Sequence, residues 1–136
     1  MTARSKARKR ALDVLFESEL RGLGTGGSLA DRLAAADPPV AEFTVDLVEG
    51  VSEHIATIDE LIGRHAVGWT LDRMPAVDRN ILRIGVYELL YDEQVPDPVA
   101  VSEAVALARD LSTDESPAFV NGVLGNILRN KPALSA

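Results

Sequence analysis

The chain has 136 residues, which suits one domain or two small subdomains sharing a core. Hydrophobic residues make up 46% of it, enough for a packed core and too many for a disordered protein. It has no cysteine, which excludes disulfides and thiolate metal sites or nucleophiles, and no uncharged run reaches the ~18 residues of a membrane span. No apolar segment follows the N-terminus, so we expect no secretory signal. We expect the protein to be cytoplasmic.

The net charge of -7 is distributed unevenly along the sequence. Residues 1–10 carry five basic side chains and no acidic one, which leaves nine basic and 21 acidic side chains for the remainder. This asymmetry predicts a localised anion-binding end on an acidic body, and that body could equally meet a basic protein partner. The five basic residues are Arg4, Lys6, Arg8, Lys9 and Arg10.

Helical periodicity predicts three helices in the first part of the chain. The first runs over about 3–21 and ends in the glycine-rich loop 22–27. Ser28 is the expected N-cap of a short helix over 29–36, and the prolines 38 and 39 are expected to open the third helix. That third helix carries the apolar positions Val40, Phe43, Leu47, Val48 and Val51.

Four more helices are expected after a bend between His54 and Thr57. The first continues through 55–62, a loop over 68–74 contains Trp69, and the next helix runs from about Pro75 to Tyr91. Asp97-Pro98 starts another, whose apolar stripe extends from Ala100 to Leu111. We predict an all-α fold without strands, a single domain over 1–136 in which about seven helices form two packed groups of three to four helices, at about 1–54 and 55–136.

The last helix combines apolar periodicity with two glycines and two asparagines. Ser116 can cap it, and Pro117 suits its first position, where the missing N–H costs nothing. Each glycine lowers helix propensity by roughly 1 kcal/mol, so tertiary packing must hold this helix. Gly122 and Gly125 are expected to let another helix approach closely.

The stretch Phe119-Val120-Asn121-Gly122-Val123-Leu124 resembles the FVNGVL signature of the NusB family of bacterial transcription antitermination factors. Three further stretches agree with that family in order and spacing: the basic start at 4–10, the segment from Pro75 to Leu89, and Val95-Pro96 leading to 102–105. The resemblance covers about residues 6–128. It implies a non-enzymatic adaptor without a cofactor that pairs with NusE, a small-subunit ribosomal protein. The pair would bind single-stranded boxA-type RNA of rRNA leaders, join the antitermination complex on RNA polymerase and suppress premature termination.

The resemblance and the charge pattern together nominate an RNA site. Basic side chains would hold phosphates, while Phe16 and the loop before the last helix would contact bases or sugars. Phe16 stands where the family often has tyrosine, Glu115 is one methylene longer than the usual acid, and Ser5 interrupts the basic cluster. The expected RNA-binding residues are Arg4, Lys6, Arg8, Lys9, Phe16, Glu115, Ser116 and Phe119.

A mixed charged face is expected on the helix that begins near Pro75. Asp78, Arg79 and Arg83, near Tyr87 and Glu88, are its charged positions, and the resemblance implies a protein-binding face in this region. The alternative is that these charged residues are simply solvated surface positions that bind no partner. For Phe16 the alternative is plain core packing, and for the loop at 112–117 it is helix capping.

No catalytic or metal site is expected. His54 and His65 lie 11 residues apart without metal-ligand spacing, and the nucleophile motif GxSxG is absent. The rival functions are a NusB-like module of an rRNA methyltransferase system and a helical interaction protein that binds no RNA. Sequence leaves the oligomeric state open, a homodimer included.

Overall fold

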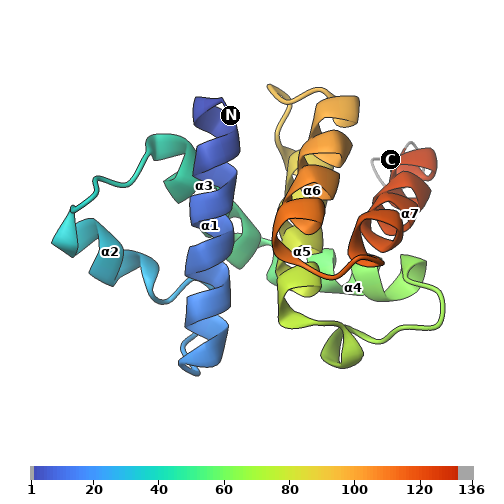
Figure 1. Cartoon of the computed structure of the whole chain (residues 1–136), viewed down its shortest axis with the longest axis horizontal. Coiled ribbons are helices and arrows are strands. Elements are labelled where there is room, and N and C mark those ends of the chain that lie inside the picture. Colours follow the sequence, from blue (N-terminus) through green and yellow to red (C-terminus); the bar gives the residue numbers. More distant parts are fainter. Residues whose placement is uncertain (1, 132–136) are drawn as a thin grey trace. The chain divides into compact units, whose positions relative to one another are not determined.

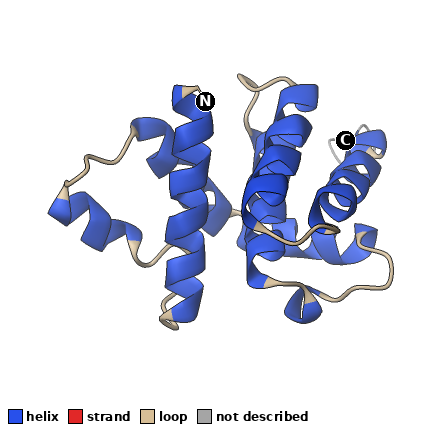
Figure 2. Cartoon of the chain, viewed as in Figure 1, coloured by secondary structure: helices blue, strands red, loops and turns tan. Residues whose placement is uncertain are grey.

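The computed structural model of the chain describes residues 2–131, and within that range it contains helices and loops but no strand (Figures 1 and 2). The chain divides into two compact units, Met1–Ile55 and Ala56–Ala136. The prediction of an all-α fold with seven α-helices is confirmed for the described residues. The α-helices are α1 (Ala3–Leu20), α2 (Leu29–Ala35), α3 (Glu42–Glu53), α4 (Ile55–His65), α5 (Ala76–Tyr91), α6 (Asp97–Leu111) and α7 (Ser116–Arg129), with a short 3-10 helix η1 (Leu71–Arg73).

In the first unit, α1 packs against α3 (Figure 1). The Thr44 hydroxyl of α3 donates a 2.9 Å hydrogen bond to the Ala7 carbonyl of α1 and ties the two helices together. Gly26 lies in the left-handed region, and a Cβ there would come within 2.6 Å of Val48 Cγ1, so this turn requires glycine. The buried apolar side chains are Ala7, Ala11, Leu12, Val14 and Leu15 of α1, Leu29 of α2, and Leu47, Val48 and Val51 of α3.

One expectation for the first unit is confirmed in position only, and another is wrong. Ser28 is the N-cap residue of α2, but its side chain makes no capping hydrogen bond; its buried hydroxyl lies 3.1 Å from the Val14 carbonyl and 3.0 Å from Ser18 Oγ instead. The third helix does not open at the prolines but at Glu42, after a non-helical segment that contains a cis Asp37–Pro38 bond. Val40 therefore lies outside the helix, although the apolar positions from 47 onwards are buried as expected.

In the second unit, α5, α6 and α7 pack against one another (Figure 1). Helices α5 and α7 approach closely at Gly85, where an added Cβ would lie 2.7 Å from Leu124 Cδ1. This corrects the expectation for the last helix: nothing lies within 4 Å of a Cβ built on Gly122, and Gly125 meets only the Arg129 side chain. The glycine that permits close packing is on α5, not on α7.

The remaining helix boundaries follow the sequence closely. His54 caps α3 and separates it from α4, where a bend was expected. Pro75 immediately precedes α5. The buried residues of α6 lie at the expected spacing and are Ala100, Ala104, Leu107 and Ala108. The loop before α5 contains η1, which the sequence did not predict.

Candidate nucleic-acid interface

The predicted RNA-binding residues form two groups, one in each unit. The first group lies on the first four turns of α1. The Thr2 side chain caps this helix by accepting a hydrogen bond from the Ser5 backbone N–H at 3.0 Å. No acidic residue occupies the first turn, so the positive end of the helix dipole and the basic side chains reinforce one another. Lys6 and Lys9 are exposed there and offer two ammonium groups to an anion.

Phe43 of α3 organises two of the arginines. The Arg4 guanidinium lies 4.8 Å from the centre of the Phe43 ring and the Arg8 guanidinium lies 5.2 Å from it. Both distances suit cation–π contacts, which restrict how the guanidiniums move. Arg4 remains exposed and can still meet a phosphate.

Arg8 does not fit the role that the sequence suggested. Only 2% of the residue is exposed, so its guanidinium is part of the packed interior and not of a surface that meets phosphates. Arg10 is half-buried and donates a hydrogen bond to the Pro38 carbonyl at 3.3 Å, which links α1 to the loop before α3. The basic run therefore divides into exposed residues, namely Arg4, Lys6 and Lys9, and residues that support the unit, namely Arg8 and Arg10.

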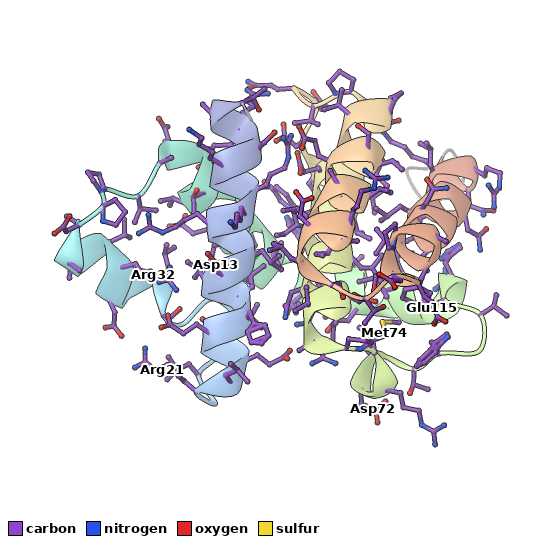
Figure 3. The ribbon with its side chains drawn as sticks, viewed as in Figure 1. Asp13, Arg21, Arg32, Asp72, Met74 and Glu115 are labelled. Carbon is purple, nitrogen blue, oxygen red and sulfur yellow. The ribbon has the colours of Figure 1, made fainter. Side chains whose placement is uncertain are left out.

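Phe16 lies two turns further along α1 and is half-buried. Part of its ring is therefore exposed, which is compatible with a base contact as well as with packing. The next residue of α1, Glu17, forms an ion pair with Arg32 of α2, with 3.3 Å between Glu17 Oε2 and Arg32 Nη2. Figure 3 shows Arg32 on the helix beside α1. A hydrogen bond from the Ser28 side chain, and next the Arg32 guanidinium, hold the pKa of Glu17 below its usual value.

The second group surrounds the loop between α6 and α7. Ser116 is buried, and its hydroxyl donates to Asp78 Oδ2 at 2.8 Å and accepts from the Thr113 backbone N–H at 3.2 Å. The Ser112 hydroxyl donates to the other oxygen, Asp78 Oδ1. Because Ser116 is enclosed by these bonds, the expectation that it touches RNA does not fit the structure. Its role is to hold the start of α7 against α5.

Beside this cluster is a cavity of about 120 Å³. Phe119 lies on it with Trp69, and their ring centres are 6.1 Å apart in an edge-to-face arrangement. Glu115 is exposed at its rim and makes no capping hydrogen bond; Figure 3 shows it at the start of α7. The residues that line the cavity are Trp69, Pro75, Asp78, Thr113, Glu115, Ser116 and Phe119.

The charged side chains expected to form a face on α5 make contacts within the second unit. Asp78 and Glu88 are buried, contrary to expectation. Arg79 donates to the backbone carbonyls of Leu71 and Met74, at 2.7 and 3.2 Å, and so anchors η1. Arg83 forms a bidentate pair with Asp59 of α4, with N–O distances of 2.8 and 2.9 Å. Asp78, Arg79 and Arg83 are therefore each engaged within the second unit, Asp78 as a buried side chain and the two arginines as half-buried ones.

Sequence reasoning missed two aromatic residues of these sites. The sequence predicts Trp69 in a loop without a role; the one feature that marks it is its residue type, a tryptophan beside Gly68 and Thr70 and outside any apolar period. The sequence predicts Phe43 as an apolar position of α3, and its pairing with Arg4 and Arg8 depends on how α1 crosses α3, which no local pattern encodes.

Two absences hold for residues 2–131. No group of three or more His, Asp or Glu side chains in this range could hold a metal ion. None of the helices in the same range is long and apolar enough to cross a membrane.

Comparison with known proteins agrees with the resemblance seen in the sequence. The family model described as the NusB family matches residues 5–129. The transcription antitermination protein NusB of Nocardioides sp. is 62% identical over 135 residues, which cover 99% of this chain and 100% of that protein.

Solved structures agree as well. Thermotoga maritima NusB superposes with a TM-score of 0.82 at 31% identity, covering 98% of this chain and 96% of that one. A NusB chain from a complex of antitermination factors NusB and NusE with double-stranded RNA superposes with a TM-score of 0.80 at 31% identity, covering 93% and 96%. This chain belongs to the NusB family of transcription antitermination proteins.

Proposed function

We propose that this chain pairs with the ribosomal protein NusE, binds boxA-type single-stranded rRNA leader RNA, and thereby suppresses premature termination by RNA polymerase. The observation that carries the proposal is the exposed basic start of α1 on a chain whose net charge is -7. Full-length similarity to NusB proteins and the NusB–NusE–RNA complex among its structural relatives support it.

In the proposed complex, the first turns of α1 bind the RNA backbone. Arg4, Lys6 and Lys9 are the exposed cations there, and each phosphate that they neutralise releases counterions from the RNA. Such contacts position the RNA without reading its sequence. Phe16, Glu115 and Phe119 would contact bases, since each keeps part of its side chain exposed.

The acidic remainder of the chain suits a basic ribosomal protein as its partner, and it also discourages RNA from binding away from α1. Asp78, Arg79 and Arg83 are not part of the proposed NusE surface because their side chains are engaged within the second unit. We propose that the protein acts in the cytoplasm and by binding alone, without catalysing a reaction.

The test is fluorescence anisotropy of a labelled boxA-type RNA titrated with this protein, alone and with equimolar NusE, against a scrambled RNA. We expect the boxA-type RNA to bind more tightly than the scrambled RNA, and NusE to strengthen that preference. Equal affinity for the two RNAs, with NusE present and absent, would contradict the proposal and favour a helical interaction protein without RNA specificity.

A further inference from the structure

The cavity beside the α6–α7 loop has the chemistry of a pocket for one base. We propose that Trp69 and Phe119 hold a single unstacked base of the bound RNA, and that the Glu115 carboxylate at the rim selects guanine. This inference rests on the proposed RNA-binding function and adds to it a residue, Trp69, and a base preference.

The walls of the cavity favour a flat aromatic guest. Trp69 is 48% exposed, an unusual position for the largest apolar side chain, and Phe119 is half-buried beside it. Their rings meet edge to face, so one ring can stack on a guest while the other contacts its edge. The volume of about 120 Å³ is well below the roughly 300–1,000 Å³ of pockets for drug-sized ligands, so a base fits the cavity better than a whole nucleotide.

The polar groups at the inner side of the cavity are already paired. Asp78 accepts hydrogen bonds from Ser112 and Ser116 on its two oxygens, and the Thr113 hydroxyl lies 2.8 Å from Ser116 Oγ. These groups fix the shape of the cavity but have little capacity for a guest. Glu115 differs, because it is exposed and its carboxylate is not engaged in capping α7.

A carboxylate with two free oxygens discriminates among the four RNA bases. It accepts two parallel hydrogen bonds when a partner presents two adjacent donors. Guanine does so with its ring N1–H and its exocyclic amino group. Adenine and cytosine each place an acceptor nitrogen beside the amino group, and uracil flanks its single N–H with two carbonyls; those acceptors repel the carboxylate.

Trp69 also makes the proposal measurable, because it is the only tryptophan of the chain. Its intrinsic fluorescence therefore reports this cavity, while anisotropy of an end-labelled RNA reports binding anywhere on the protein. The probes are oligouridine strands that carry one central guanosine, inosine, adenosine or cytidine. Inosine keeps the ring N–H of guanosine but lacks its amino group.

For the unmodified full-length protein, we expect the guanosine strand to bind most tightly and to change Trp69 fluorescence over the same concentration range as the anisotropy. Replacing guanosine by inosine is expected to weaken binding about tenfold, the loss of one charge-assisted hydrogen bond. Glu115→Gln is expected to remove most of the difference between guanosine and inosine, and Glu93→Gln, an exposed matched control in the same unit, is expected to retain it.

Trp69→Ala and Phe119→Ala are each expected to weaken binding of the guanosine strand roughly 5- to 100-fold, the range for one base–aromatic stack. Because Trp69 is exposed in a loop, its replacement tests the pocket without a core cavity. RNA binding by anisotropy without any change in Trp69 fluorescence, or with guanosine and inosine equal, would overturn the pocket while leaving the proposed function standing. Absence of anisotropy change with every strand and with boxA-type RNA would overturn the proposed function, and the pocket with it.

Discussion

The hydroxyl of Ser116 donates a 2.8 Å hydrogen bond to the carboxylate of Asp78, and both residues are buried. This bond joins the first turn of α5 to the first turn of α7, 38 residues later in the chain. It fixes the start of α7, which Glu115 immediately precedes and whose first turn contains Phe119, so a buried polar contact positions the candidate base-binding residues.

Asp78→Ala should therefore destabilise the protein. The change leaves two hydroxyls, those of Ser112 and Ser116, without their acceptor, at a cost of about 1–3 kcal/mol in the free energy of unfolding. Chemical denaturation monitored by circular dichroism measures this change in the free energy of unfolding. Asp110→Ala, at an exposed position, is the control and should change the value by no more than about 0.5 kcal/mol. Equal midpoints for the two variants would mean that the buried carboxylate contributes nothing to stability.

Two ion pairs that involve α4 should differ in strength. The Asp59–Arg83 pair is bidentate and its side chains are 28% and 14% exposed, whereas the Glu60–Arg64 pair has side chains 65% and 55% exposed. Double-mutant cycles to alanine should give a coupling of about 1 kcal/mol for the first pair and about 0.3–0.5 kcal/mol for the second. The same variants measure partner binding: a folded Arg83→Ala protein should keep its affinity for NusE. Loss of NusE affinity without loss of stability would restore Arg83 to the partner surface.

Alanine should have opposite effects at two helical glycines. Gly85→Ala forces a Cβ against the buried Leu124 side chain, with distances of 2.7 and 3.1 Å to its two methyl groups, and overpacking of this kind typically costs about 1–3 kcal/mol. Gly122→Ala meets no atom within 4 Å and should gain up to about 1 kcal/mol from helix propensity. The melting temperature of each variant, compared with that of the unmodified protein, tests both expectations. A higher melting temperature for Gly85→Ala would show that α5 and α7 are not as close as the structure places them.

Stability should depend on acid pH through Glu17. A hydrogen bond from Ser28, and next the Arg32 guanidinium, lower the pKa of Glu17 in the folded protein. A lowered folded-state pKa means that its stabilising contribution is present above the unfolded-state pKa, about 4.3, and is lost as the pH falls through the folded value. Glu17→Gln should therefore unfold at lower temperature than the unmodified protein at pH 7, and the gap should close towards pH 3. A gap that is the same at both pH values would contradict this assignment.

The fold was largely accessible from the sequence because its signals are local. Each signal spans only a few neighbouring residues. Examples are the apolar residues at helical spacing, the glycine-rich loop at 22–27 and the proline at 75, and most helices lie where these patterns predict them. The start of α3 was placed wrongly because prolines permit a helix start but do not require one.

The sites were less accessible because burial and pairing depend on distant residues. Arg8, Ser116 and Asp78 have polar side chains that are usually exposed, and nothing nearby in the sequence marks them as buried. Asp78 is enclosed by hydroxyls from the α6–α7 loop, and Arg8 stacks with Phe43 of another helix. For the same reason, Trp69 became a candidate only when its ring was found beside Phe119.

In the proposed complex, the exposed cations at the start of α1 bind RNA phosphates. The most direct measurement is the slope of log affinity against log salt for a boxA-type RNA, in the unmodified protein and in the double variant Lys6→Ala/Lys9→Ala. We predict that the slope becomes shallower by roughly 1.4, about 0.7 for each lost phosphate contact, and that the matched variant Arg109→Ala/Arg129→Ala, which removes two exposed arginines of the second unit, leaves it unchanged. An unchanged slope for the Lys6/Lys9 variant, or an equal reduction in the matched control, would contradict phosphate binding by these two lysines.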